Sequence, residues 1–197
     1  MPTYIARISH GKDSLKMLDV IVSRGLPLDQ ITTSDVWATD TISACLPPVE
    51  EFKARMDELI WKKYRIEVEH LCARNPDGSK KTYEQMFYHI PKRKEGLCGL
   101  YCQYGDMLSP SYETSCRDGC WFCHNQGVDQ LRLLRKNYPD RWALLLKWDK
   151  DSITTFHPDG HTVHDFDYRF QCEDEGLLPK DKAFRWAMLD AVQLKMF

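Results

Sequence analysis

The feature that most constrains this chain is a short β-prone run that passes through a polar turn straight into a helical pattern. Residues 4–8 form the run, and the turn from Ser9 to Ser14 reads Ser-His-Gly-Lys-Asp-Ser; apolar residues then recur at helical spacing (Leu15, Leu18, Ile21 and Val22). A strand, a tight turn and a helix in this order direct backbone N–H groups and the positive helix end towards one point. The turn therefore predicts a site for an anion such as a phosphate, and an ordinary connection with a serine cap is the alternative.

The segments that follow predict a parallel sheet. Residues 30–37 and 66–71 are β-prone, and between them a proline pair at 47–48 opens a helical pattern with apolar residues on one face (Phe52, Met56, Leu59 and Ile60). Strands that alternate with helices favour an α/β fold with right-handed crossovers.

Asp35 lies near the end of the second predicted strand. Because the carboxyl ends of parallel strands meet at one edge of a sheet, we expect Asp35 beside the turn. A carboxylate there can bind Mg²⁺ or orient a nucleotide, and a turn residue without a ligand is the alternative. Asp40 is a second candidate for the same role.

Eight cysteines are many for a chain of 197 residues, and three of them form a Cys-x-x-x-Cys-x-x-Cys motif. The N-terminus has no apolar signal region, which favours a cytoplasmic, reducing compartment and metal binding over disulfides. Thiolates at this density select Zn²⁺ or an iron–sulfur cluster. The predicted ligand set is Cys102, Cys116, Cys120 and Cys123. Cys98 and Cys172 stay open as the fourth ligand, and a set of buried free thiols is the alternative.

The turn resembles the PP-loop, usually Ser-Gly-Gly-x-Asp-Ser, of the ATP pyrophosphatase and PAPS reductase superfamily. Five of six positions agree, counting Lys12 at the free position, and His10 stands where the family usually has glycine. A β-carbon at this position has a conformational cost if the turn needs a positive φ.

A second stretch supports the same resemblance. Residues 119–126 read Gly-Cys-Trp-Phe-Cys-His-Asn-Gln, which is similar to the Gly-Cys-Trp-Phe-Cys-Pro-Asn-Gln stretch of PAPS-reductase-like proteins from phages and mobile elements. His124 replaces the proline. Together the similar segments cover roughly residues 4–71 and 116–150.

The resemblance implies a Rossmann-like parallel sheet flanked by helices, of the adenine nucleotide α-hydrolase type. It implies a single domain over residues 1–197, with a nucleotide-binding core at 1–73, a Cys-rich metal-binding insertion at 74–127 and a small C-terminal part with helices and a hairpin at 128–197. ATP with Mg²⁺ is the expected ligand, bound by the six residues of the turn (Ser9, His10, Gly11, Lys12, Asp13 and Ser14). Lys12, Asp13 and Asp35 are the expected catalytic residues.

The activity that the resemblance implies is cleavage of ATP to AMP and pyrophosphate, which activates an acceptor by adenylation. Sulfur transfer is one use of such activation, with tRNA or another nucleic acid as a candidate acceptor. A PAPS or APS reductase is a second hypothesis, although the chain lacks the Glu-Cys-Gly-Leu-His tail of true PAPS reductases. A nucleotide-binding or nucleic-acid-binding module without turnover is a third.

Two further stretches offer weaker hypotheses. Residues 80–101 mix basic and aromatic side chains, which can bind single-stranded nucleic acid or can form an ordinary helix with a solvated flank. The net charge of −2 argues against nucleic-acid binding through bulk electrostatics. Pro158-Asp159-Gly160 predicts a hairpin turn, and the histidines around it offer a second, less favoured metal site (His157, His161 and His164). We expect no membrane partner, because no run of residues has the length of a transmembrane helix.

Overall fold

The computed structural model describes residues 3–88, 92–93, 96–97, 120–152, 155–180 and 183–193. These residues fall into two compact units. The first holds residues 3–88 with Cys120 and Trp121, and the second holds the described residues at 92–97 and from Phe122 onward.

The first unit is an α/β unit built around a three-stranded parallel sheet with strand order β1-β2-β3. Its elements follow one another as β1 (Ile5–Ile8), α1 (Lys12–Ser23), β2 (Gln30–Asp35), α2 (Pro47–Tyr64), β3 (Val68–Cys72) and α3 (Tyr83–Tyr88). The register pairs Ile8 with Thr33 and Thr33 with His70. The parallel sheet flanked by helices that the sequence predicts is therefore confirmed.

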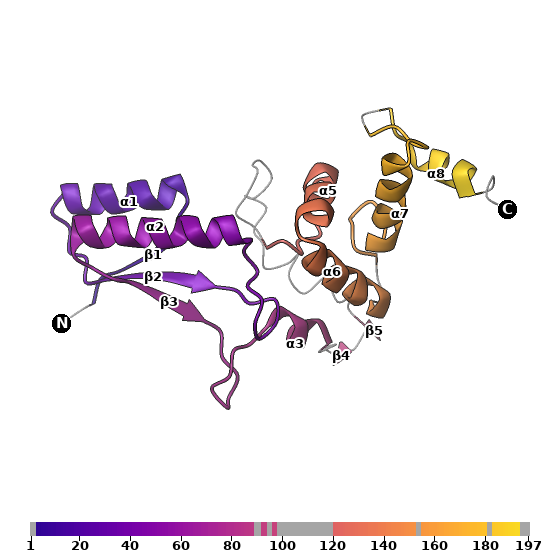
Figure 1. The fold of residues 1–197 in the computed structure, drawn as a ribbon. Coiled ribbons are helices and arrows are strands. Elements are labelled where there is room, and N and C mark those ends of the chain that lie inside the picture. The colour runs from indigo at the N-terminus through magenta and orange to yellow at the C-terminus, as the bar shows by residue number, and fades with distance from the viewer. Residues whose placement is uncertain are drawn as a thin grey trace. The chain divides into compact units, whose positions relative to one another are not determined.

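One face of this sheet carries the apolar core. Ala6, Ile8 and Ile31 are buried there against Leu18 of α1 and Ile60 of α2. Both helices lie on this same side of the sheet (Figure 1). Because side chains alternate along a strand, Arg7 points to the other face and hydrogen-bonds Ser34 across the strands.

The ends of α1 and α2 follow from their sequences. At the end of α1, Gly25 adopts a φ of +63°, the left-handed conformation that glycine supplies after a helix. α2 begins at Pro47, where the missing N–H of proline would have no helical partner in any case.

The second unit is mainly helical. It contains the antiparallel pair β4 (Lys92–Arg93) and β5 (Gly96–Leu97), followed by α5 (Val128–Asn137), α6 (Pro139–Asp151), α7 (Val163–Asp174) and α8 (Trp186–Gln193). The carboxylate of Glu173 is buried in α7 between two guanidinium groups. Its oxygens accept hydrogen bonds from Arg169 at 2.7 Å and from Arg132 at 2.9 Å.

The predicted hairpin around Pro158 is wrong. The turn itself forms, with the Gly160 amide donating to the His157 carbonyl, but a helix follows it. Thr162 and Asp165 form a capping box, in which each side chain accepts a hydrogen bond from the other's backbone N–H, and this starts α7. Among the residues that the structure describes, no helix combines the length and the apolar character that a bilayer crossing requires.

Candidate functional site

The turn between β1 and α1 contains a residue in an unusual backbone conformation. His10 has a φ of +60°, whereas Gly11, the N-cap of α1, has a φ of −71°. The position that carries histidine in place of the PP-loop glycine is thus the one that needs a positive φ. For a side chain with a β-carbon, this left-handed conformation costs about 1–2 kcal/mol.

The first turn of α1 leaves its backbone donors open. Within the described residues, the N–H groups of Lys12 and Asp13 donate to no protein acceptor, as expected at a helix N-terminus. Both side chains are exposed. The Ser14 hydroxyl is used inside the turn, because it donates to the Gly11 carbonyl at 2.9 Å and accepts from the Ser9 amide at 3.3 Å.

The ring of His10 points away from solvent and reaches α2. The side chain is 2% exposed, and its Nε2–H donates to Oδ1 of Asp57 at 2.7 Å. The ring also stacks on that of His70, with the centroids 6.1 Å apart. Nδ1 of His10 is buried and has no hydrogen-bond partner among the residues described.

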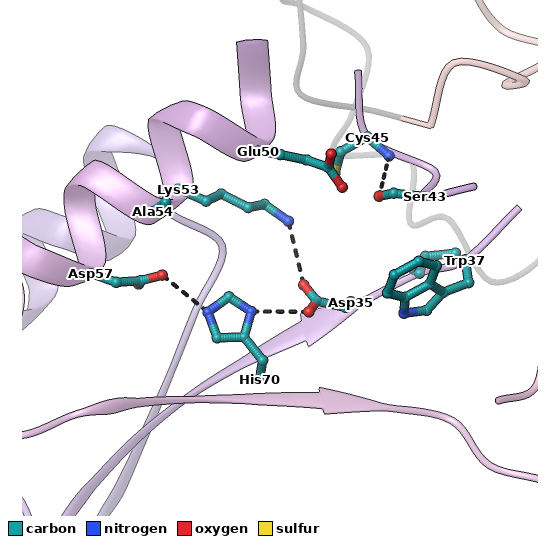
Figure 2. A pocket seen from close by; sticks show the side chains of 10 residues that line it. Asp35, Trp37, Ser43, Cys45, Glu50, Lys53, Ala54, Asp57 and His70 are labelled. Carbon is teal, nitrogen blue, oxygen red and sulfur yellow. Dashed lines mark hydrogen bonds and ion pairs between the residues drawn. The ribbon is translucent and has the colours of Figure 1, made fainter. Parts of the chain in front are cut away.

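His70 connects the two carboxylates of the site. Its Nε2–H donates to Oδ2 of Asp57 at 3.0 Å, and its Nδ1–H donates to Oδ2 of Asp35 at 2.9 Å (Figure 2). The ammonium group of Lys53 lies 3.8 Å from the other oxygen of Asp35. One side chain of the turn, two of the sheet and two of α2 therefore form a continuous polar network.

The pKa of His70 reflects this setting. Partial burial by itself would lower the pKa, but the hydrogen bonds to Asp57 and Asp35 outweigh it and raise the pKa above the ordinary 6.5. Each ring nitrogen has a carboxylate to donate to, which favours the doubly protonated imidazolium.

A pocket of about 200 Å³ opens beside the network at the carboxyl end of β2. Asp35, Lys53, Asp57 and His70 line it, together with a loop after β2 and the start of α2 (Val36, Trp37, Ser43, Cys45, Glu50 and Ala54). In Figure 2, Lys53 and Asp57 extend from α2 towards the strand residues Asp35 and His70. Open α/β sheets bind ligands at this edge.

The structure brings only part of the predicted site together. Asp35 lines the pocket, whereas Asp40 is exposed and does not. The sequence reasoning missed Lys53, Asp57 and His70. The sequence held a signal for His70, because its side chain falls on the same face of the third predicted strand as Ile66 and Val68. It held none for Asp57, because only the tertiary packing of α2 decides which helix residues face the sheet.

The loop that lines the pocket is held by a residue from much later in the chain. Trp121 is 1% exposed, its indole Nε1–H donates to the Ser43 carbonyl at 2.9 Å, and its amide donates to the Ala44 carbonyl at 3.0 Å. Trp121, which directly follows Cys120, is thereby fixed against this loop.

The predicted cysteine ligands are described only in part. Cys102 and Cys116 lie outside the described residues, as does Cys98. Cys120 and Cys123 are half-buried and take part in no disulfide. Burial raises the pKa of the Cys123 thiol, while the backbone N–H of Asn125 acts in the opposite direction. The four-cysteine site stays a prediction.

The alternative fourth ligand, Cys172, is part of a core. It is 2% exposed in α7 and packs with Leu178, Phe184 and Leu189. Among the described residues, this thiol is surrounded mainly by apolar side chains, as expected for a structural cysteine.

The three histidines near Pro158 do not converge. They pair with three different aspartates: His157 with Asp159 at 2.7 Å, His164 with Asp149 at 2.6 Å, and His161 with Asp165 at 3.8 Å. Within the described part of the chain, the group with metal-ligand geometry is instead His10, Asp57 and His70.

The basic and aromatic stretch favours the structural interpretation where it is described. Tyr83 and Phe87 of α3 are 3% and 1% exposed, so their rings cannot stack on bases, while Tyr88 is about half exposed. Lys80 lies over the ring of Trp37, 3.2 Å from its centroid. Lys94 and Tyr101 lie outside the described residues.

Comparison of the chain with protein-family models, with curated proteins and with solved structures found no match in any of the three.

Proposed function

We propose that this chain is a nucleotide-binding enzyme of the PP-loop type, which cleaves ATP to AMP and pyrophosphate and so activates an acceptor by adenylation. The observation that carries the proposal is the open first turn of α1 at the carboxyl edge of a parallel sheet. There, the unpartnered N–H groups of Lys12 and Asp13 and the positive helix end favour a phosphate.

The left-handed residue in the turn supports the same proposal. The PP-loop motif has glycine at this position, and the structure has a φ of +60° there, which is the conformation glycine adopts without strain. In this proposal the strand order β1-β2-β3 with its two helices is the first part of a Rossmann-like sheet of the adenine nucleotide α-hydrolase type. We also propose that residues 74–127 form a Cys-rich insertion that binds a metal.

Cleavage of ATP in this site would depend on charge and position. The backbone donors of the turn, with the Lys12 ammonium group, would stabilise the negative charge that develops on the phosphates. Lys53 adds a second cation in the pocket. Mg²⁺ would accompany ATP, but Asp35 accepts from His70 and lies 3.8 Å from Lys53, so Asp35 could bind the ion only if Lys53 moved.

Trp121 supports a proposal for where the acceptor would bind. Because Trp121 is bound to the loop that lines the pocket, sulfur carried by the adjacent Cys120 would be near an activated group. Thiolation of a nucleic acid such as tRNA is therefore the acceptor chemistry that we favour. Reduction of PAPS or APS through Cys172 receives no support, since that thiol lies in an apolar core.

The proposal is tested by the products of ATP turnover. The full chain is incubated with ATP and Mg²⁺, with and without bulk tRNA, and AMP and pyrophosphate are the expected products. ADP and phosphate as products would overturn the mechanism, and tight binding of ATP without turnover would identify a non-catalytic module instead.

Binding to the turn is tested separately. We expect Lys12→Ala to weaken ATP binding by at least about tenfold, because a hydrogen bond to a charged group contributes about 1.5–3 kcal/mol. Lys16→Ala is the matched control, since Lys16 is also an exposed lysine of α1 but lies one turn further along. Equal effects of the two substitutions would contradict a phosphate site in the turn.

A further inference from the structure

Three side chains at the carboxyl edge of the sheet combine donor atoms that suit a transition metal. One donor atom from each of His10, Asp57 and His70 lies within 4.8 Å of the donor atoms of the other two. The three residues come from separate elements, namely the turn after β1, the middle of α2, and β3. Their convergence is therefore a product of the fold and not of a local sequence motif.

We propose that Nε2 of His10, a carboxylate oxygen of Asp57 and Nε2 of His70 bind one divalent transition-metal ion, with Zn²⁺ as the expected occupant. Two imidazole nitrogens and one carboxylate are a donor set for Zn²⁺ or Fe²⁺, whereas Mg²⁺ and Ca²⁺ prefer oxygen donors. The site is distinct from the cysteine motif and does not rest on nucleotide binding.

Both histidine nitrogens already lie against the carboxylate of Asp57. Nε2 of His10 lies 2.7 Å from one oxygen of Asp57, and Nε2 of His70 lies 3.0 Å from the other. Ligand atoms around a tetrahedral Zn²⁺ are about 3.3 Å apart, given metal–ligand bonds of about 2.0–2.1 Å. An ion would take the place of the hydrogens that both Nε2 atoms now share with Asp57. His70 would release its Nε2 proton to solvent and keep its Nδ1–H on Asp35, whereas neutral His10 would bind as the tautomer with its hydrogen on Nδ1.

Asp35 supplies the support that metal-binding histidines commonly have. It accepts a hydrogen bond from Nδ1–H of His70 at 2.9 Å, which fixes the ring and leaves Nε2 as the nitrogen for the ion. Nδ1 of His10 has no such partner among the described residues. We therefore expect His70 to be the stronger of the two histidine ligands and Asp35 to be its positioning residue.

Such a site would have positions for further ligands. Three protein ligands are the number found in catalytic zinc sites, where the remaining position holds water or substrate. Asp57 and His70 also line the pocket of about 200 Å³. A water molecule or an anionic oxygen of a ligand in this pocket is the expected fourth ligand.

The test is direct metal binding by the full chain without nucleotide. The protein is stripped with a chelator, and Co²⁺ is titrated into it as a spectroscopic substitute for Zn²⁺. To remove the predicted thiolate ligands, the titration uses a variant in which serine replaces five cysteines: Cys98, Cys102, Cys116, Cys120 and Cys123. We expect one equivalent of Co²⁺ to bind with the visible bands of nitrogen and oxygen ligands and without thiolate charge-transfer absorption.

Single substitutions in this background locate the ion. His70→Gln and Asp57→Asn should each weaken Co²⁺ binding by more than tenfold, and Asp35→Asn by about tenfold. His164→Gln is the matched control, because His164 also pairs with a carboxylate, Asp149, at 2.6 Å but stands outside the cluster. It should leave affinity and spectrum unchanged.

Two results would overturn the proposal. One is the absence of a Co²⁺ equivalent once the cysteines are replaced, with circular dichroism showing a folded chain. The other is binding that His70→Gln and Asp57→Asn leave unchanged. ATP binding is measured on the same samples, and its failure with Co²⁺ binding intact would reject the nucleotide proposal while leaving the metal site in place.

Discussion

Nε2 of His10 is hydrogen-bonded to Oδ1 of Asp57 at 2.7 Å, and this contact joins the turn after β1 to the middle of α2. His10 has a left-handed backbone although it carries a β-carbon, and its buried imidazole makes this contact with Asp57. A residue kept in a strained conformation at the ligand edge of a sheet suggests a functional role for its side chain.

The backbone of His10 gives the first prediction. We expect His10→Gly to be more stable than His10→Ala by about 1 kcal/mol, because both lose the ring but only alanine keeps a β-carbon at a φ of +60°. Urea unfolding followed by circular dichroism measures the difference. Ser9 is the control, because its φ is not positive: there, Ser9→Ala should be more stable than Ser9→Gly. Equal stabilities of His10→Gly and His10→Ala would contradict the left-handed conformation at position 10.

Gly11 tests whether a ligand approaches the turn. A β-carbon at Gly11 would meet only the Ser9 hydroxyl, at 3.5 Å, so Gly11→Ala should cost less than about 1 kcal/mol of folding free energy. ATP affinity should nevertheless fall, on the order of tenfold, because a phosphate needs close access to the backbone there. Calorimetric titration gives the affinity.

The control for this substitution is Gly127→Ala. Gly127 is also a helix N-cap, with a φ of −68°, and its β-carbon would meet nothing within 4 Å. Gly127→Ala should change the free energy of unfolding by less than about 1 kcal/mol and should leave ATP affinity unchanged. A Gly11 variant that binds ATP as well as the parent would show that no phosphate sits on the turn.

The raised pKa of His70 predicts how stability changes with pH. In chelator-treated protein, the charged His70 stabilises the fold fully below the unfolded value of 6.5, and this contribution is lost as pH rises through the raised folded value. The difference in free energy of unfolding between the parent and His70→Gln should therefore shrink as pH rises across that window. Urea unfolding over a pH series measures this difference. A difference that grows as pH rises would contradict a stabilising, charged His70.

The buried carboxylate of α7 predicts a large loss of stability. Glu173→Gln keeps the shape of the side chain but leaves Arg169, which is 6% exposed, without its counter-charge. We expect about 3 kcal/mol of destabilisation, since removal of one partner leaves a buried charge uncompensated. Its neighbour Asp174 pairs with Arg135 and Lys180 at the surface, so Asp174→Asn should stay within about 1 kcal/mol. Similar losses of stability from Glu173→Gln and Asp174→Asn would contradict the difference between the buried and the surface carboxylate.

Local chemistry made the first unit predictable. The run before Ser9, the polar turn and the apolar spacing from Leu15 predicted β1 and α1. Alternation of strands and helices was enough for a parallel sheet, because few chain paths satisfy the handedness of crossovers. Asp35 was placed at the correct edge for the same reason.

The polar network of the site was not predictable in this way. Asp57 and Lys53 differ little in sequence context from the other charged residues of α2, and only the packing of the helix on the sheet decides which of them face His70. The hairpin at Pro158 failed for a local reason. The capping pattern from Thr162 to Asp165 was overlooked, and it favours a helix over a second strand.

Trp121 donates its indole N–H to a carbonyl 78 residues earlier in the chain. The strands, helices and turn at the N-terminus can assemble from residues that leave the ribosome first, since their contacts span short separations. The loop that lines the pocket receives its anchor only once residue 121 has emerged. During synthesis, we therefore expect the sheet to form before the loop that lines the pocket is fixed in place.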